Sequence, residues 1–177
     1  MRTFLGTLIA MSWLSLFTTA RADPLAVGAQ APAVSGTTES GEKIDLGAIY
    51  PKGYTLVYFF PKADTPGCTA EGCSLRDAFQ DLSERNVTVI GVSADDVAAQ
   101  KAFKDKYHFP FTLIADKDHT VIQAFGVPVR QVPAVGSFAA RQSFLINKEG
   151  RIVWRDLKAS TKEQARDVLA ALKENQG

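Results

Sequence analysis

The sequence predicts an α/β fold in which a mixed central sheet is flanked by helices. Two apolar runs rich in β-branched and aromatic residues, 55–60 and 87–93, are separated by a segment with helical periodicity, which is typical of a parallel βαβ unit. Two later strand-like runs, 142–146 and 152–154, are joined by a short turn containing Gly150 and should therefore pair antiparallel. With 177 residues, of which 46% are hydrophobic, the chain suits one globular domain.

The N-terminal segment, residues 1–22, has the pattern of a secretory signal peptide. Arg2 supplies the charged start, an apolar run follows, and Ala20-Arg21-Ala22 has the small-x-small form of a cleavage site. The run has about 14 residues, fewer than the roughly 20 that span a membrane as a helix. We therefore expect cleavage after Ala22, no membrane contact afterwards, and a single domain over residues 23–177.

The predicted cleavage changes the charge and the expected compartment. It removes Arg2 and Arg21 and no acidic residue, so the formal charge goes from +1 to −1. A near-neutral surface gives no electrostatic reason to expect nucleic acid as a partner. Export, most simply to a bacterial periplasm, implies an oxidising compartment, where two cysteines ordinarily form one structural disulfide.

The first predicted elements are an arm, a hairpin and a core strand. Residues 23–32 are expected to form an extended arm. Residues 34–37 and 43–46 flank Glu39-Ser40-Gly41, a turn-forming segment, and should form a short hairpin. The run 55–60 is apolar at consecutive positions and predicts a strand buried on both faces.

A helix is predicted after that strand, because Leu75, Phe79 and Leu82 recur at spacings of four and three. This helix should run to about Arg85. The segment 87–93 then predicts a second buried strand, parallel to the first.

Another βαβ step follows. Asp95-Asp96 should begin a helix that carries Val97, Phe103 and Tyr107. Residues 112–115 predict a third strand and residues 118–125 a short helix ended by Gly126. Residues 127–140 contain Pro and Gly and are expected to form a loop.

The predicted C-terminal part is the antiparallel pair 142–146 and 152–154, followed by a helix. This last helix should begin at a capping box, Ser160 with Glu163 three residues later. Strands in βαβ and then ββα order, with helices on both faces of a mixed sheet, describe a thioredoxin-like sandwich. That conclusion concerns the fold alone.

Both cysteines lie in one stretch, residues 61–73, between the first core strand and its helix. Cys68 is placed where the strand gives way to a helix N-terminus. Unpaired backbone N–H groups and the positive end of the helix dipole favour a thiolate at such a place. The stretch is therefore the candidate reactive centre.

The spacing of Cys68 and Cys73 argues against a permanent disulfide. On one continuous helix their Cα atoms would be roughly 8–9 Å apart, whereas a disulfide requires less than about 7 Å. A bond between them would require the first helical turn to unwind, which suits a transient catalytic disulfide better than a structural one.

The pattern Pro61-x-x-x-Thr65-x-x-Cys68, with Cys73 five residues later, resembles the peroxiredoxin family. More narrowly, residues 64–73 followed by Leu75-Arg76-Asp77 look like the Q-type group, also called bacterioferritin comigratory proteins. Arg141, which opens the run 142–146, resembles the second element of the family pattern. The resemblance covers roughly residues 28–172.

The resemblance implies a thiol-dependent peroxidase. Cys68 would be the peroxidatic nucleophile and become a sulfenic acid, and Cys73 would resolve it as an intramolecular disulfide. The substrate would be hydrogen peroxide or an organic hydroperoxide, and the reductant a thioredoxin- or glutaredoxin-like dithiol. The resemblance implies a monomer and no cofactor.

The resemblance also assigns roles around Cys68. Thr65 would hydrogen-bond the thiolate and the substrate, and Arg141 would stabilise the thiolate and the charge that moves onto the leaving oxygen. Pro61 would shield the site from water. Glu71 would orient Arg141 through a carboxylate pair, and Gly67 is a further candidate for orienting the substrate or thiolate.

Each of these residues also has a structural interpretation. Pro61 could simply end a strand, Thr65 could be a helix N-cap, and Arg141 alone could be a solvated strand-edge residue. His108 and His119 are expected to be surface or packing residues, because their spacing with the cysteines matches no common zinc pattern. We therefore expect no metal site.

The segment 127–140 departs from the Q-type pattern, which usually carries a Trp and several Gly or Lys residues there. Here the segment is more apolar, and it should line the mouth of the pocket. Val129, Val132 and Val135 would favour organic hydroperoxides.

Two other functions remain open from the sequence. An exported thioredoxin-like thiol–disulfide oxidoreductase would share the fold, but that class resembles Cys-x-x-Cys with a facing cis-proline, whereas four residues separate the cysteines here. A redox-sensing binding module would use Cys68 oxidation to open the helix and expose apolar surface to a partner.

Overall fold

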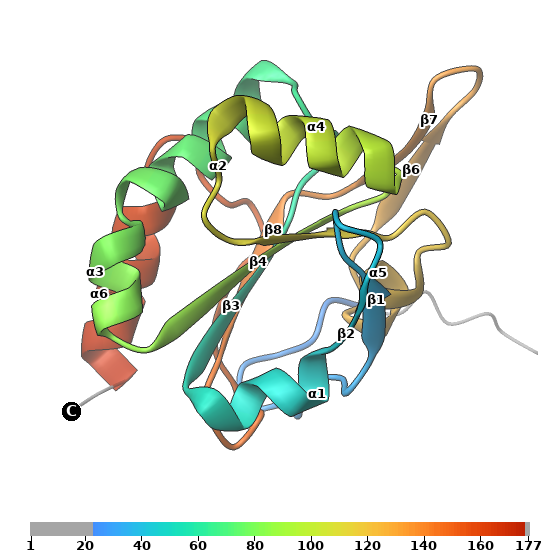
Figure 1. Ribbon diagram of the computed structural model, residues 1–177. Helices are drawn as coiled ribbons and strands as arrows, with labels where there is room; N and C mark the ends of the chain where they lie inside the picture. The colour runs from blue at the N-terminus through green and yellow to red at the C-terminus, as the bar shows by residue number, and fades with distance from the viewer. Residues whose placement is uncertain (1–22, 176–177) are drawn as a thin grey trace, which may run out of the picture.

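The computed structural model describes residues 23–175, so the predicted signal peptide lies outside the described residues. A five-stranded mixed sheet with strand order β5-β4-β3-β8-β9 forms the centre, and helices cover both of its faces (Figure 1). This is the predicted α/β thioredoxin-like architecture. No helix in the described part of the chain is long and apolar enough to cross a membrane.

The pairing within the sheet confirms the predicted strand directions. β3 (Tyr54–Phe59) runs parallel to β4 (Val87–Ser93), and β4 runs parallel to β5 (Thr112–Ala115). β8 (Gln142–Ile146) is antiparallel to both β3 and β9 (Ile152–Asp156). Because β3 and β8 are antiparallel neighbours, the segment that follows β3 and the segment that precedes β8 meet at the same end of the sheet.

The sheet separates two hydrophobic cores. One lies under α2, α3, α4 and α6, and its buried members include Phe60, Leu75, Leu82, Phe103 and Val168. The other lies under α1, α5 and the small β1–β2 hairpin, and its buried members include Leu46, Phe59, Val121, Phe125 and Phe144. Alternating residues of β3 therefore contribute to both cores, as a strand buried on both faces requires.

The N-terminal hairpin is confirmed, with β1 (Ser35–Thr37) antiparallel to β2 (Lys43–Asp45). A short helix α1 (Leu46–Ile49) and a 3₁₀ turn η1 (Tyr50–Lys52) follow it and were not predicted. Asp45 caps α1 by accepting the N–H of Gly47. A four-residue helix is too short for its apolar residues to show a period.

The prediction of one helix running to about Arg85 is wrong. The chain forms α2 (Pro66–Asp77) and then α3 (Phe79–Glu84), with a break at Ala78, where φ is −96° and ψ is 9°. Leu75 and Leu82 still point into the same core. The apolar spacing predicted the buried face correctly and carried no sign of the break.

The other predicted helices are present with shifted starts. α4 (Val97–Tyr107) is capped by Asp96 and ends at His108 in the left-handed conformation. α5 comprises Thr120–Ala124. The capping-box prediction for the last helix is only partly correct: Ser160 Oγ accepts the N–H of Glu163, yet α6 (Gln164–Asn175) begins after a turn over residues 161–163.

The segment 127–140 is a hairpin, not the predicted loop. β6 (Val129–Val132) pairs antiparallel with β7 (Gly136–Ala139), and the hairpin extends away from the central sheet (Figure 1). Ala134 and Gly136 adopt positive φ values at the turn, 63° and 119°. Pro and Gly here mark the turn between two short strands, and such strands resemble a loop when viewed in sequence alone.

Candidate active site

Cys68 lies in the first turn of α2, which follows the end of β3 and a short loop. Thr65 is the N-cap, and Pro66 occupies the first helical position, where its missing N–H costs no hydrogen bond. Cys68 is 1% exposed. The N–H groups of Gly67 and Cys68 belong to the first turn, which has no helical acceptors for them, so they are donors available to an anion.

Arg141 reaches Cys68 from a distant part of the chain. It lies between β7 and β8, and its Nη2 donates to Cys68 Sγ at 3.3 Å although 73 residues separate them in the chain. The adjacency of β3 and β8 brings the two segments together. A guanidinium at this distance stabilises negative charge on sulfur and on an oxygen bound beside it.

Glu71 holds the guanidinium in place. Its Oε2 accepts a hydrogen bond from Arg141 Nη1, and its side chain is fully buried. Burial raises the pKa of Glu71 to about 8, while the charge of Arg141 and the hydrogen bond oppose that rise. Its other oxygen, Oε1, has no protein hydrogen-bond partner. The predicted contact between Glu71 and Arg141 is therefore formed.

Gly67 lies under the guanidinium. A Cβ at this position would be 3.3 Å from Arg141 Nη2 and 3.4 Å from Thr161 Cγ2. The absence of a side chain therefore lets Arg141 lie close over the first turn of α2. This placement gives Gly67 a steric role beside the predicted orienting one.

The predicted hydrogen bond from Thr65 to Cys68 is not formed in the described structure. Thr65 Oγ1 donates instead to the carbonyl of Lys62 at 3.0 Å, and Thr65 makes no side-chain cap hydrogen bond. Its hydroxyl thus closes the turn before α2. The hydroxyl must rotate away from Lys62 before it can donate to a thiolate or a substrate.

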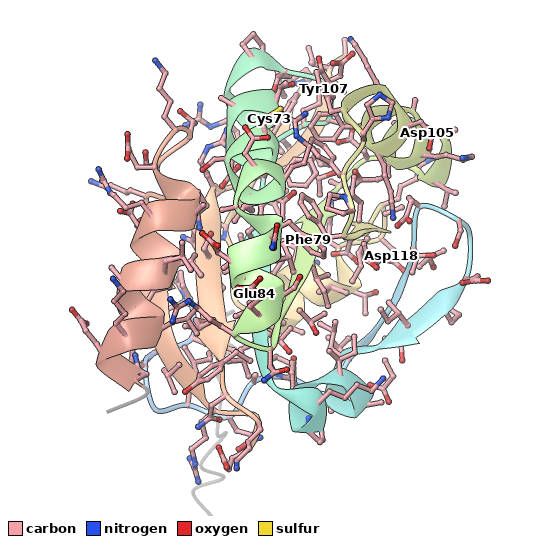
Figure 2. All side chains as sticks on the ribbon, turned by 60° about the vertical axis from the view of Figure 1, so that its left-hand side comes forward. Cys73, Phe79, Glu84, Asp105, Tyr107 and Asp118 are labelled. Carbon is pink, nitrogen blue, oxygen red and sulfur yellow. The ribbon has the colours of Figure 1, made fainter. Side chains whose placement is uncertain are left out.

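Cys73 lies on the same helix, half-buried and near the Tyr107 side chain in projection (Figure 2). Both cysteines are free thiols. Because α2 is continuous from Pro66 to Asp77, the two residues are held apart by helical geometry. A bond between them requires α2 to unwind at its first turn, as the spacing predicted.

A groove lies next to the site and opens between Pro61 and the β6–β7 hairpin. It has a volume of about 490 Å³, and it is lined by Pro61, Pro128, Val129, Arg130, Val132, Phe138, Ala139 and Ala140. Val135, the third valine of the prediction, is not in the lining and is exposed at the hairpin tip. Except for Arg130, the lining side chains are apolar.

Sequence reasoning missed a carboxylate that anchors the loop before α2. Asp95 Oδ2 accepts the N–H of Ala63 at 2.7 Å and the hydroxyl of Ser93 at 2.7 Å. Asp95 was assigned only to the start of the next helix. A polar residue directly after a buried strand of a parallel pair was the available signal, because the C-terminal ends of β3 and β4 lie side by side.

A second missed group lies at the end of α4. Lys106 Nζ and Tyr107 Oη both donate to the carboxylate of Asp64, which precedes α2 and has a φ of 58°. Tyr107 was predicted only as part of an apolar face. Nothing in the local sequence links residues 64 and 107.

The histidines take no part in the site. His108 ends α4 and His119 precedes α5, both in the left-handed conformation. Within residues 23–175 no group of three or more His, Cys, Asp or Glu side chains could hold a metal ion.

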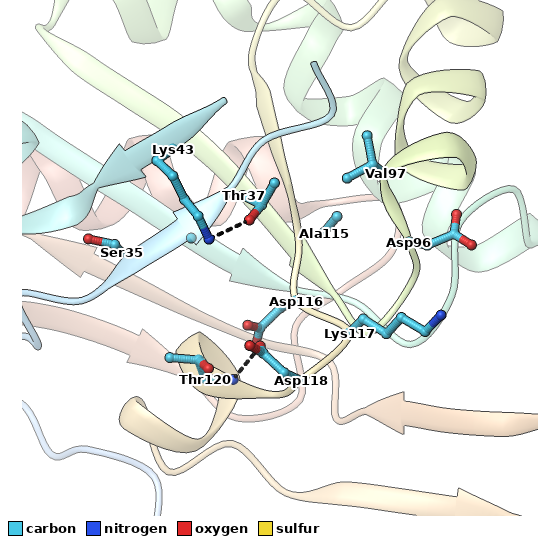
Figure 3. Close-up of a pocket in the computed structure, with 11 residues that line it drawn as sticks. Ser35, Thr37, Lys43, Asp96, Val97, Ala115, Asp116, Lys117, Asp118 and Thr120 are labelled. Carbon is cyan, nitrogen blue, oxygen red and sulfur yellow. Dashed lines mark hydrogen bonds between the residues drawn. The ribbon is translucent and has the colours of Figure 1, made fainter. Parts of the chain in front are cut away.

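A second hollow, of about 470 Å³, lies beside β1, the start of α4 and the end of β5 (Figure 3). Several of its polar groups already have partners within the fold. Asp116 accepts the N–H groups of Val121 and Ile122, and Lys43 donates to Thr37. Because these groups stabilise local structure and no residue of the stretch 61–73 lines the hollow, we place the chemistry at Cys68.

Comparison with known proteins gives a consistent result. Residues 27–155 match the family described as the AhpC/TSA family. A putative peroxiredoxin bcp of Coxiella burnetii is 43% identical over 136 residues, which cover 75% of this chain and 89% of that protein. Peroxiredoxin Bcp of Escherichia coli is 38% identical over 157 residues, covering 86% of this chain and 99% of that protein.

Solved structures show the same fold. The peroxidoxin BcpB of Mycobacterium tuberculosis has a TM-score of 0.78 at 27% identity, covering 84% of this chain and 96% of that chain. A structure of the bacterioferritin comigratory protein of Xanthomonas campestris, reported for its alkyl peroxide reduction activity, has a TM-score of 0.76 at 27% identity. It covers 86% of this chain and 100% of that one.

Proposed function

The chain belongs to the AhpC/TSA family, and from that premise we propose that it reduces hydroperoxides with the thiol of Cys68 as the nucleophile. It is a peroxiredoxin of the Bcp and peroxiredoxin Q group. One observation carries the assignment of the site: Arg141 Nη2 lies 3.3 Å from Cys68 Sγ, above a helix N-terminus.

The first step is an attack by the Cys68 thiolate on the terminal oxygen of the hydroperoxide. An S–O bond forms between Cys68 and that oxygen, and the O–O bond breaks. The electron pair of the O–O bond leaves with the other oxygen, which takes a proton and departs as water or an alcohol. Arg141 and the N–H groups of the first turn face the developing negative charge. Cys68 is left as a sulfenic acid.

The second step forms a disulfide within the chain. The first turn of α2 unwinds, Cys73 attacks the sulfenic sulfur, and hydroxide leaves and takes up the proton of the Cys73 thiol to form water. Since both cysteines belong to one helix, this step needs no second subunit. We therefore propose that the protein acts as a monomer.

The third step returns two electrons and two protons to the disulfide. A dithiol protein of the thioredoxin or glutaredoxin type supplies both by thiol–disulfide exchange through a mixed disulfide. Cys73 is half-buried, whereas Cys68 is buried. In the reduced, folded helix Cys73 is therefore the more exposed of the two thiols.

The groove beside Pro61 favours organic hydroperoxides over hydrogen peroxide. Its lining is apolar over Val129, Val132 and Phe138, and its volume of about 490 Å³ exceeds what hydrogen peroxide needs. Burying an aryl or alkyl substituent there would add binding free energy that hydrogen peroxide cannot gain. The alkyl peroxide activity reported for the Xanthomonas campestris relative agrees with this proposal.

The proposed place of action is outside the cytoplasm, most simply a bacterial periplasm. Residues 1–22 support this through their charged start, apolar run and Ala20-Arg21-Ala22. Cell fractionation with mass spectrometry of the mature chain tests it: an exported protein that begins at Asp23 supports export, and a cytoplasmic protein that retains the segment contradicts it.

The test of the peroxidase is stopped-flow oxidation of the reduced protein by hydrogen peroxide and by cumene hydroperoxide. Quenched samples are analysed by mass spectrometry, and Cys68→Ser and Cys73→Ser are measured alongside. We expect rapid oxidation that Cys68→Ser abolishes, and a trappable sulfenic acid in Cys73→Ser. Oxidation no faster than that of a free thiol would refute the peroxidase and favour disulfide exchange or redox-dependent partner binding.

A further inference from the structure

We infer that Lys106 and Tyr107, at the C-terminal end of α4, are positioning residues that hold the Cys68 turn of α2 folded and thereby set how fast Cys68 reaches Cys73. The inference rests on the proposed function, because it concerns the second step of that cycle. It concerns residues outside the Cys68–Arg141 contact.

The contact is a cluster of three side chains, which we call the Asp64 latch: Asp64, Lys106 and Tyr107. Lys106 Nζ lies 2.9 and 2.8 Å from the two carboxylate oxygens of Asp64, and Tyr107 Oη donates to Oδ1 at 2.7 Å. Both donors lower the pKa of Asp64, so the carboxylate is charged at neutral pH. Asp64 thus makes three contacts with one end of one helix.

The position of Asp64 gives the latch a mechanical role. Asp64 lies two residues before α2 and has a φ of 58°, a left-handed conformation that Asp adopts at a modest cost. A chain reversal at this point directs Thr65 and Pro66 into the helix. Releasing Asp64 from α4 would free the segment that leads into the turn carrying Cys68.

The same end of α4 also holds the middle and the far end of α2. The ring of Phe109 lies against Gly72, where an added Cβ would meet Cζ at 2.6 Å. The carbonyl of Tyr107 accepts a hydrogen bond from Arg76 Nη1 at 2.9 Å. The part of α2 that carries Cys73 is therefore held by contacts that are separate from the latch.

The two sets of contacts differ in strength. Asp64 and Lys106 have side chains that are 46% and 57% exposed, so water and salt compete with their pairing. Phe109 is buried against α2. Opening should therefore begin at the latch and move Cys68 toward a Cys73 that stays in place.

The stability of the latch then sets the balance between two reactions of the sulfenic acid, disulfide formation and further oxidation. If the turn opens, Cys73 attacks and a disulfide and water form. If it stays folded, a second hydroperoxide oxidises the sulfenic acid to sulfinic acid and leaves as water or an alcohol. A weaker latch should give faster disulfide formation and less sulfinic acid at the same dose of peroxide.

The experiment measures oxidation and disulfide formation separately by quenched-flow mass spectrometry in Tyr107→Phe and Lys106→Gln. Tyr107→Phe keeps the ring that packs on Phe103 and Phe109 and removes only the hydroxyl. The matched control is Lys101→Gln, which removes the exposed pair with Asp105 on the same helix and touches no atom of the latch.

We expect disulfide formation to be about two- to fivefold faster in both latch variants, the range that corresponds to loss of an exposed ion pair or hydrogen bond. Oxidation of Cys68 should keep the wild-type rate, and Lys101→Gln should match the wild type in both steps. In the wild type, raising salt from about 0.05 M to about 1 M should speed disulfide formation, and Lys106→Gln should respond less.

Unchanged disulfide formation in both latch variants would overturn the inference. So would an equal fall in both rates, which indicates general destabilisation. Slow Cys68 oxidation in the wild type would instead refute the proposed peroxidase. The latch is then judged by amide hydrogen exchange over residues 67–70: faster exchange in Tyr107→Phe than in Lys101→Gln supports it, and equal exchange overturns it.

Discussion

The two cysteines lie on one helix and in different surroundings. Cys68 is 1% exposed and receives a hydrogen bond from Arg141 at 3.3 Å. Cys73, just over one turn later, is half-buried, and three residues beyond it Arg76 pairs with the exposed Asp77. Both are cysteines on the same helix. The difference between their proposed roles therefore comes from the side chains that other segments place around each thiol.

This difference indicates that the oxidation of Cys68 and the later formation and reduction of the disulfide require opposite surroundings for a thiol. The attack on a hydroperoxide is favoured where water is excluded and fixed donors face the developing charge. Resolution and reduction require a thiol that other groups can reach. One helix meets both demands because its N-terminus lies under Arg141, whereas Cys73 further along is only half-buried.

The largest effect on peroxidase turnover is expected from Cys73→Ser, which tests whether the two thiols have separate roles. Turnover with a dithiol donor should be lost, because the sulfenic acid has no partner within the chain, while the first oxidation of Cys68 should keep the wild-type rate. Steady-state assays and single-turnover stopped flow measure the two quantities. If both were lost together, the two thiols would not have separate roles.

A large effect on the first step alone is expected from Arg141→Lys. Lysine keeps the charge but cannot contact Glu71 and Cys68 at once through two nitrogens, so oxidation of Cys68 should slow by about 100-fold, as when one preorganised donor is removed. The control is Arg166→Lys on α6, whose side chain is 70% exposed and lines no part of the groove. A wild-type oxidation rate in Arg141→Lys would show that charge, not geometry, matters, and a similar loss in both variants would indicate general destabilisation.

A pH effect is expected from Glu71→Gln. Burial raises the pKa of Glu71 to about 8, so the folded state binds a proton that the unfolded state has already lost above about pH 4.5. Wild-type stability should therefore fall as pH rises through this window, with a limiting slope of about 1.4 kcal/mol per pH unit.

Urea unfolding of the wild type and of Glu71→Gln between about pH 5 and 8 measures that slope, which should be smaller in the variant. Asp77→Asn, an exposed carboxylate on the same helix, serves as the control and should keep the wild-type slope. Equal slopes in wild type and Glu71→Gln would show that Arg141 keeps the buried carboxylate ionised in the folded protein.

The smallest effect is expected from Phe138→Ala in the groove. The rate constant kcat/KM for cumene hydroperoxide should fall about fivefold, since loss of part of one apolar contact costs on the order of 1 kcal/mol. The rate with hydrogen peroxide should stay near that of the wild type. Val135→Ala at the hairpin tip is the control, and an equal fall with both substrates would contradict the groove as a substrate site.

The strongest sequence predictions concern segments whose signal is local. The run 87–93 became β4 without any shift, and the run 112–115 became β5 in the same way. Consecutive β-branched residues stabilise extended backbone and tolerate burial on both faces, so neighbouring positions alone are informative. The strand-to-helix junction at Cys68 was predicted for the same reason.

The failures share a different cause. The break at Ala78 leaves Leu75 and Leu82 on the same buried face, so the apolar spacing does not reveal it, and β6 and β7 are short strands whose turn residues a loop would also contain. The predicted bond from Thr65 to Cys68 is absent because the Thr65 hydroxyl donates to the carbonyl of Lys62 instead. The acceptor of a hydroxyl hydrogen bond depends on distances of a few ångströms between atoms, and a sequence motif does not specify those distances.

The fold class and Cys68 as the candidate nucleophile could be inferred without a structure, because both follow from a motif or from the spacing of residues a few positions apart. The contacts between distant side chains, in contrast, depend on the tertiary structure. Arg141 contacts Cys68 because β8 lies beside β3, and Asp64 contacts Tyr107 because α4 ends next to the start of α2. Such contacts join residues 73 and 43 positions apart, and chain topology, not local propensity, brings them together.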